Sequence, residues 1–237
     1  MPNHTIFNER PESQDRALKV IEKLGYTIVP RSEAEKKRGS RRAVLFTEEL
    51  QSFLSHQTYQ FGTEERYFSG GSIAKAMQTV NQFSAAGLYA ENKAIYELLC
   101  AGKSMEEDLP DGTRQSFDLS FIDFEHPENN TFQVTDEFEV ERPNGKFARP
   151  DIVILVNGIP LVVIECKKSS VDVMEGVNQN IRNWSEDYIP HLFRYTQLVL
   201  AMNPDKVLYG TCGTPAKYFV SWHEDDKEWL NDWCRKC

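Results

Sequence analysis

Two apolar strands joined by an Asn-Gly pair constrain the fold of this chain more than any other stretch of its sequence. Residues 149–168 read RPDIVILVNGIPLVVIECKK, and two aliphatic runs flank Asn157-Gly158. This arrangement is the strongest short-range indication of a β-hairpin. Three charged residues stand at the ends of its strands: Asp151 opens the first, and Glu165 and Lys167, two residues apart, close the second. Because buried apolar strands do not need such charges, these three residues are the candidates for function.

The length of the hairpin loop decides whether the three charges meet. A two-residue loop places Asp151 opposite Ile164, on the face away from Glu165. A loop of three or five residues, for example a type I turn closed by Gly158 in the left-handed conformation, shifts the register by one. Asp151, Glu165 and Lys167 then share a face, and we predict this second register. Two adjacent carboxylates repel unless a cation lies between them, and their oxygens suit Mg²⁺ or Mn²⁺.

The charged positions resemble a known motif. Pro150-Asp151, thirteen further residues and then Glu165-Cys166-Lys167 are similar to the PD-(D/E)xK motif of nucleases. The fuller stretch, with NNTFQVTDEFEV before it and NQNIRNW after it, closely resembles the N-terminal nuclease domain of the restriction (R) subunit of type I restriction-modification enzymes. The likeness covers roughly residues 115 to 185 and is thinner on either side.

This resemblance implies a Mg²⁺-dependent endonuclease that hydrolyses phosphodiester bonds of double-stranded DNA. Asp151, Glu165 and the main-chain carbonyl of Cys166 would hold the Mg²⁺ ion, for which Mn²⁺ could substitute, and Lys167 would position the attacking water. The family's R subunit also carries an ATP-driven translocase and works with methylation and specificity subunits. ATP would serve only that translocase, which residues 1–237 do not encode. We therefore expect a single nuclease domain that is a fragment of a longer subunit.

The resemblance adds a possible ligand on the first helix. In PD-(D/E)xK folds a carboxylate on the first core helix often reaches the metal or its water, and Glu9, Glu12 and Asp15 lie at the start of that helix here. Glu12 is our choice among the three. The alternative is that these acids only complement the helix dipole.

Gln179 is a further candidate, on the helix that follows the hairpin. Related nucleases carry a Q-x-x-x-Y pattern there, whereas this chain reads Gln179-Asn180-Ile181-Arg182-Asn183, followed by Trp184. Either Asn183 or Trp184 takes the place of the tyrosine, or this part of the site has drifted and activity is reduced. The alternative for Gln179 is an exposed helical glutamine without a role.

Hydrophobic periodicity divides the chain into a helical half, about 12–102, and a mixed-sheet core, about 117–222. We expect helices over 12–24, 47–54, 72–83, 88–101, 172–187 and 229–233, strands over 25–30, 117–121, 131–141, 197–202, 206–209 and 217–222, and a loop over 103–114. Pro143-Asn144-Gly145 should turn the third of these strands back toward Phe147. The order helix, three strands, helix, parallel strand is that of an α/β PD-(D/E)xK core with extra N-terminal helices.

Composition narrows the class of protein. A net charge of -9 argues against a chain that wraps nucleic acid by itself. The one dense basic run, residues 36–42, is expected to be a solvated loop, with a phosphate contact as the alternative. No membrane span or signal peptide is visible, and five scattered cysteines suit a reducing compartment, so we expect a cytoplasmic protein. Cys234 and Cys237 form a CxxC that we expect to belong to a frayed terminus rather than to a metal site.

The sequence contains no motif for the other common kinds of catalytic site. It contains no GxxxxGK[ST], GxGxxG or GxSxG, and its five histidines lack HxxxH or HxH spacing, which argues against nucleotide-triphosphate, serine hydrolase and zinc sites. Two alternatives to the restriction nuclease stay open. One is a non-catalytic docking module of a defence complex, in which the three charges form a structural salt bridge, and the other is a stand-alone DNA repair nuclease.

Overall fold

A seven-stranded mixed sheet lies at the centre of the protein, in the order β1-β6-β9-β10-β11-β12-β13. The computed structural model describes residues 12–83 and 86–222. The strands of the sheet are β1 (Thr27–Ile28), β6 (Phe132–Asp136), β9 (Ile152–Val156), β10 (Ile159–Cys166), β11 (Leu198–Met202), β12 (Val207–Gly210) and β13 (Val220–Ser221). The helices are α1 (Glu12–Lys23), α2 (Arg31–Arg38), α3 (Thr47–Ser55), α4 (Gly70–Asn81), α5 (Leu88–Ala101), α6 (Val173–Asn183) and α7 (Pro190–Phe193).

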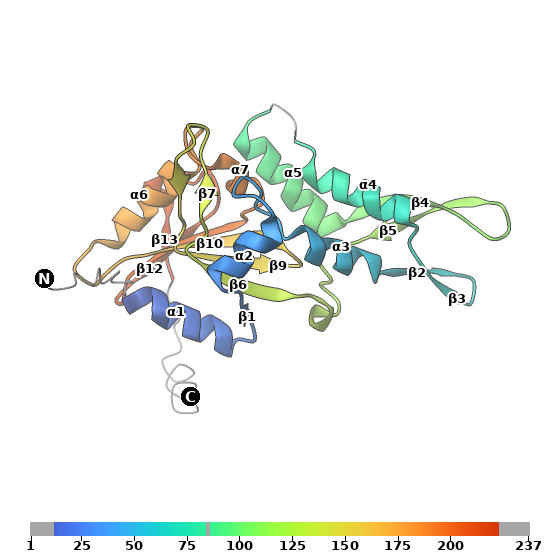
Figure 1. The fold of residues 1–237 in the computed structure, drawn as a ribbon, viewed down its shortest axis with the longest axis horizontal. Coiled ribbons are helices and arrows are strands. Elements are labelled where there is room, and N and C mark those ends of the chain that lie inside the picture. Colours follow the sequence, from blue (N-terminus) through green and yellow to red (C-terminus); the bar gives the residue numbers. More distant parts are fainter. Residues whose placement is uncertain (1–11, 84–85, 223–237) are drawn as a thin grey trace, which may run out of the picture.

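Helices cover both faces of this sheet (Figure 1). On one face, α1 packs its apolar stripe of Ala17, Leu18 and Ile21 against Ile152 and Ile164. The opposite face, which includes Val153, Val163 and Val199, packs against the core formed by α3, α4, α5 and α7. The same face receives α6, whose Val173 and Val177 contact Ala201 and Leu208. Burial on both faces explains why β9 and β10 are almost continuously apolar.

The order of elements around the central hairpin matches the expectation. β6, β9 and β10 are antiparallel neighbours, and α6 crosses over to β11, which runs parallel to β10. α1 precedes them, with α2 to α5 inserted before β6. The turn after residue 142 brings β7 (Val140–Glu141) against β8 (Phe147–Ala148), as expected. Helix, three strands, helix and parallel strand in a mixed sheet are thus confirmed.

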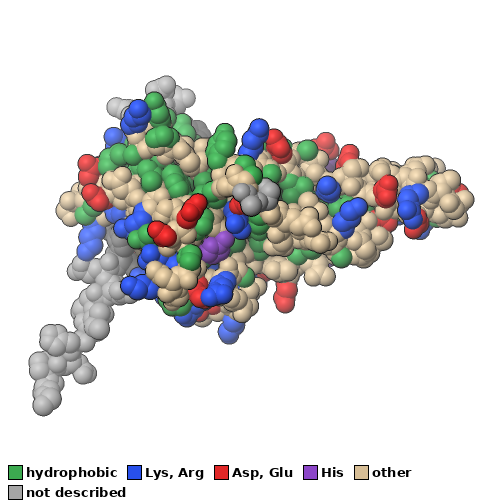
Figure 2. All heavy atoms as spheres, turned by 90° about the horizontal axis from the view of Figure 1, so that it is seen from above, with side chains coloured by type: hydrophobic (Ala, Val, Ile, Leu, Met, Phe, Trp, Pro, Cys, Tyr) green, Lys and Arg blue, Asp and Glu red, His purple; other side chains and the backbone are tan. Residues whose placement is uncertain are grey.

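The expected loop over 103–114 is wrong. Residues Lys103–Asp108 form β4, which pairs along its whole length with β5 (Arg114–Leu119). A second hairpin, β2 (Thr58–Phe61) with β3 (Glu64–Tyr67), was not expected at all. Both hairpins are rich in exposed polar residues, so that turn formers and charges hide the strands in the sequence. With α4 they extend away from the sheet as a tapering arm, along which charged side chains of both signs lie (Figures 1 and 2).

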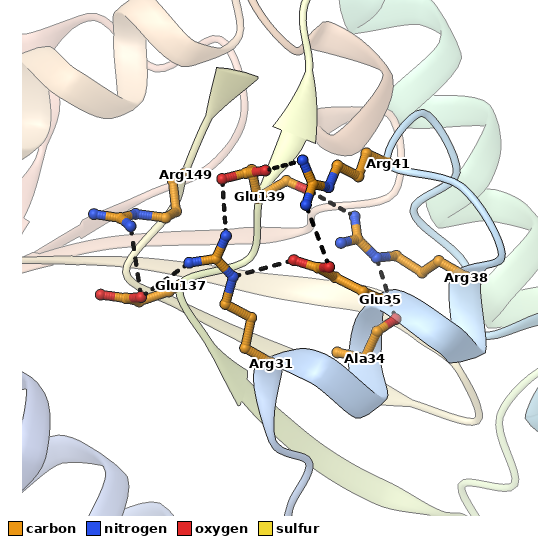
Figure 3. Close-up of polar contacts among 8 residues, drawn as sticks. All are labelled: Arg31, Ala34, Glu35, Arg38, Arg41, Glu137, Glu139 and Arg149. Carbon is orange, nitrogen blue, oxygen red and sulfur yellow. Dashed lines mark hydrogen bonds and ion pairs between the residues drawn. The ribbon is translucent and has the colours of Figure 1, made fainter. Parts of the chain in front are cut away.

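The expectation for the basic run is right only in part. Residues 36–38 form the end of α2, whereas residues 39–42 form an exposed turn, and some side chains of the run meet acids that lie about a hundred residues later in the chain. Arg41 pairs with Glu139 at 2.9 Å and Arg42 with Glu141 at 2.7 Å. Arg31, just before the run, pairs with Glu139 at 2.9 Å (Figure 3). These ion pairs attach α2 to the segment between β6 and β7.

Two single turns of 3₁₀ helix, Pro127–Asn129 and Ala216–Tyr218, lie in connections. Among residues 12–83 and 86–222, no helix is both long enough and apolar enough to cross a membrane. The expected helix over 229–233 and the Cys234/Cys237 pair lie outside the described residues.

Candidate active site

The loop of the hairpin has two residues, so the longer loop that we predicted is wrong. Val156 pairs directly with Ile159, and the residues between them have positive φ, 50° at Asn157 and 78° at Gly158. Two positive φ angles are the signature of a type I′ turn, for which Asn-Gly is preferred. A side chain at Gly158 would also lie 2.3 Å from the carbonyl oxygen of Phe46. Glycine is therefore required here by both conformation and space.

A β-bulge, and not the turn, brings the two acids to the same face. The regular pairing of Pro160 with Leu155 gives way to that of Val162 with Ile154, so Leu161 has no partner in β9. Beyond this shift Ile164 pairs with Ile152, and Asp151 comes opposite Glu165. The two acids share a face as we predicted, but the register shift that causes this lies in the strand and not in the loop. Pro160 was the available signal, because proline in a strand often marks a bulge or an edge.

The motif residues converge at the end of β10. An Asp151 oxygen, Oδ2, accepts a hydrogen bond of 2.7 Å from the Cys166 N–H. Glu165 is fully buried, and its Oε2 lies 3.8 Å from the Lys167 ammonium. That oxygen has no hydrogen-bond partner among the described residues.

Helix α6 supplies two amides to this group. Gln179 Oε1 accepts a hydrogen bond of 2.6 Å from Lys167 Nζ, so Gln179 is not an idle surface residue. Asn183 Nδ2 donates to Glu165 Oε1 at 3.1 Å. Trp184 instead packs edge-on against Phe193, with ring centroids 5.8 Å apart. Asn183 thus contacts a motif side chain, whereas Trp184 packs in the core; that Asn183 replaces the tyrosine stays a prediction.

The first turn of α1 contacts the motif through neutral side chains that sequence reasoning missed. Ser13 Oγ donates to the Lys167 carbonyl at 2.8 Å, and Gln14 Nε2 donates to the Asp151 carbonyl at 3.1 Å. Both side chains are buried. Nothing in their local sequence indicates this role, which depends on how α1 crosses the sheet. Glu9 and the side chain of Glu12 lie outside what the structure describes, so the role of Glu12 stays a prediction.

The segment after β6 fixes the other end of the motif. The N–H groups of Glu137 and Phe138 donate to the carbonyls of Asp151 and Pro150, at 2.9 and 3.0 Å. Glu137 has a φ of 48°, which is unusual for a residue other than glycine. Its carboxylate is held by Arg31 at 3.3 Å and by Arg149 at 3.5 Å (Figure 3). These ion pairs fix the chain just before Asp151.

The electrostatics of this group suit a divalent cation. Burial, and then the negative charge of Asp151, raise the pKa of Glu165 well above the usual value of a carboxyl group. A cation placed between the two acids would offset both effects, and the Glu165 oxygen that lacks a partner is available to it. Within the described ranges, no group of three or more His, Cys, Asp and Glu side chains could hold a metal ion. A third protein ligand would thus come from the main chain, as the expected carbonyl of Cys166 would.

The fold and this group of residues define a class of protein: a mixed α/β chain with an acidic, lysine-containing site at the end of its central hairpin. Comparison with known sequences identifies the family. The family described as "Type I restriction enzyme R protein N terminus" matches residues 6–218, and the chain belongs to it.

Individual relatives agree with this assignment. A putative type I restriction enzyme MjaIXP endonuclease subunit from Methanocaldococcus jannaschii is 27% identical over 94% of this chain. The type I restriction enzyme HindI endonuclease subunit from Haemophilus influenzae is 26% identical over 94% of the chain. The SsaAORF53P endonuclease subunit from Staphylococcus saprophyticus is 42% identical over 36% of the chain and 9% of its own length. The chain spans 21% of the length of each of the first two relatives.

Proposed function

We propose that this chain is the nuclease domain of a type I restriction enzyme R subunit, with a PD-(D/E)xK core that hydrolyses phosphodiester bonds of double-stranded DNA. The observation that carries the proposal is the bulged hairpin, which places Asp151 opposite Glu165 with Lys167 beside them. The order of elements around that hairpin and the names of the relatives, which are endonuclease subunits, support it.

Each residue of the site would have a separate role in hydrolysis. Asp151, Glu165 and the Cys166 carbonyl would hold Mg²⁺ or Mn²⁺, which supplies a Lewis acid that lowers the pKa of a bound water and offsets charge on the phosphate. Lys167 would contact the scissile phosphate and position the attacking water. Gln179 already accepts from the Lys167 ammonium and would orient it. Ser13 and Gln14 would keep the backbone of the motif in place.

The wider setting of the domain follows from the family and is part of the proposal. An ATP-driven translocase would lie elsewhere in the longer subunit, and methylation and specificity subunits would complete the complex and select the DNA, in the cytoplasm. Such partners would also explain how a chain with a net charge of -9 acts on DNA. Membership of a type I restriction family favours this setting over that of a stand-alone repair nuclease.

Substitution of the motif residues in the complete restriction complex tests the proposal. With Mg²⁺, ATP and unmethylated plasmid, Asp151→Asn, Glu165→Gln and Lys167→Ala should each slow double-strand cleavage by about 10²- to 10³-fold or more, because the first two weaken the hold on the metal ion and the third removes the charge beside the phosphate. ATP hydrolysis by the same complexes should stay near the unsubstituted rate. Glu175→Gln, an exposed acid on α6, is the matched control and should cut normally.

A second measurement separates the nuclease from the docking module, which the replacement of the expected tyrosine by Asn183 would favour. Calorimetric titration of the 237-residue chain with Mn²⁺ should show a site that Glu165→Gln removes. Normal cleavage by Lys167→Ala would overturn the assigned role of that lysine. A chain that binds no Mn²⁺, in a complex whose cleavage ignores all three substitutions, would identify the docking module.

A further inference from the structure

We infer that Asn183 and Gln179 form an amide clamp on α6, which holds Glu165 and Lys167 apart and so keeps one oxygen of Glu165 free for a divalent cation. The inference rests on the proposed function and deepens it. Both amides are positioning residues, because each acts through a motif side chain.

The first half of the clamp is the contact between Asn183 and Glu165. Asn183 is 2% exposed and Glu165 is 0% exposed, so water does not compete for their hydrogen bond of 3.1 Å. The bond fixes the Oε1 oxygen of the carboxylate. The other oxygen, Oε2, then faces Lys167 without a hydrogen-bond partner in the described part of the chain.

The second half restrains Lys167. Its ammonium lies 2.6 Å from Gln179 Oε1 but 3.8 Å from Glu165 Oε2. Once Glu165 has lost its proton, as cation binding requires, its carboxylate and the ammonium attract strongly because little water lies between them. The neutral acceptor on α6 offsets part of that attraction and holds the ammonium short of a close ion pair, in which lysine would occupy the oxygen that a cation needs.

Two features of α6 make the clamp possible. Residues 179 and 183 are four apart, so their side chains lie on the same face of the helix. Gly176, on the preceding turn, lets the helix approach the sheet closely: a Cβ there would lie 3.0 Å from the Ala201 Cβ and 3.5 Å from the Glu165 Cβ. This close approach lets a side chain as short as asparagine reach Glu165.

Mn²⁺ affinity of the 237-residue chain, measured by calorimetry, tests the Asn183 half. Asn183→Leu keeps the branching and the number of side-chain heavy atoms but removes the donor, and its dissociation constant for Mn²⁺ should rise by about 10- to 100-fold, as for other residues that orient metal ligands. Asn180→Leu is the matched control, because Asn180 is a buried amide on the same helix that donates to the Leu200 carbonyl at 2.9 Å. Its affinity should stay within about threefold of the unsubstituted chain, even if it unfolds more easily.

A double-mutant cycle tests the Gln179 half. Gln179→Leu should weaken Mn²⁺ binding in the unsubstituted chain, because Lys167 can then close on Glu165. In a Lys167→Met background the same change should have no effect, since no ammonium remains to be restrained. A role of Gln179 in helix stability alone would give equal losses in both backgrounds.

The outcomes separate failure of the clamp from failure of the proposed function. If the unsubstituted chain binds Mn²⁺, while Asn183→Leu binds as tightly or Gln179→Leu acts independently of Lys167, the clamp is wrong and the nuclease proposal stands. If Asn183→Leu does not fold, Asn183→Ala provides the test. Alanine removes the donor and adds no charge, so the Mn²⁺ dissociation constant of this variant should also rise, and an unchanged affinity would overturn the clamp.

Discussion

At the scale of single residues, Glu165 shows how position changes a carboxylate. It is enclosed by the sheet and by α6, faces Asp151, and accepts a hydrogen bond from Asn183. Burial first, and the charge of Asp151 second, raise its pKa well above 4.5. The folded protein therefore keeps the proton of Glu165 at pH values where an unfolded chain has already lost it.

This shift gives the metal-free protein a pH dependence with a definite sign. The folded state binds more protons than the unfolded state from pH 4.5 up to the raised pKa of Glu165, so this contribution to stability is present below pH 4.5 and is lost as the pH rises through that range. Glu165→Gln cannot titrate, and in chelator its melting temperature should fall less between pH 5 and pH 8 than that of the unsubstituted chain. Equal slopes in scanning calorimetry would contradict the assignment.

Gly158 offers a stability test with a built-in control. Gly158→Ala meets both a positive φ and the Phe46 carbonyl 2.3 Å away, whereas Gly62→Ala meets only the positive φ, with nothing within 4 Å. The conformational penalty should cost each variant about 1–2 kcal/mol, and the clash should cost Gly158→Ala about 1–3 kcal/mol more. Urea unfolding of both variants measures the difference, and equal losses would show that the turn relaxes away from Phe46.

At the scale of elements, α2 is attached by a buried arginine as well as by its surface ion pairs. The Arg38 guanidinium donates to the carbonyls of Glu139, Ala43 and Ala34 at 2.9, 3.2 and 3.4 Å. It also lies 4.0 Å from the centre of the Phe138 ring. Because Phe138 and Glu139 follow directly after β6, this side chain joins the helix to the segment that holds Asp151.

Removing that side chain should loosen both elements. Arg38→Leu would leave the three carbonyls without their donor, and we expect it to lower the free energy of unfolding by about 2–4 kcal/mol. Lys36→Leu, an exposed change on the same helix, should stay within about 0.5 kcal/mol. Chemical denaturation of both variants provides the comparison, and a loss for Arg38→Leu no larger than that for Lys36→Leu would mean that water replaces the guanidinium at little cost.

The elements that could be predicted from the sequence are those whose buried residues form a local hydrophobic pattern. The apolar runs of β9, β10 and β11 and the amphipathic stripe of α1 were predictable for this reason. The strands β2, β3 and β4 and the first half of β5 were not, because most of their polar residues face solvent, whereas the expected strand over 117–121 overlaps the end of β5. The bulge at Leu161 was also missed, since a register depends on the partner strand. The pairing of Arg41 and Arg42 with Glu139 and Glu141 was missed because these acids lie about a hundred residues away, where no local pattern indicates them.

The sequence singles out the three charged residues that the fold brings together, but not the geometry that brings them together. Asp151, Glu165 and Lys167 stand out because charges are rare in buried strands. Ser13, Gln14 and Asn183 are ordinary residues for a helix, and only the packing of α1 and α6 on the sheet brings them to the motif.

At the scale of the whole molecule, the sheet and the arm should differ in local stability. β9 and β10 are paired on both sides and almost fully buried, whereas β2 and β3 pair only with each other and are largely exposed. Hydrogen exchange followed by mass spectrometry should find the slowest amides in β9 and β10 and much faster ones in β2 and β3. Equal protection in the two regions would show that the arm unfolds only with the core.

Leu161 occupies a place in β10 that has no counterpart in β9. A hairpin without that residue could pair regularly from its turn to the ends of its strands. Its two acids would still lie opposite each other, with one residue fewer between them. The interval that separates the aspartate from the glutamate is therefore free to differ by one among relatives, whenever a bulge is gained or lost along with it. Searches that insist on one fixed interval would overlook sites of the same geometry.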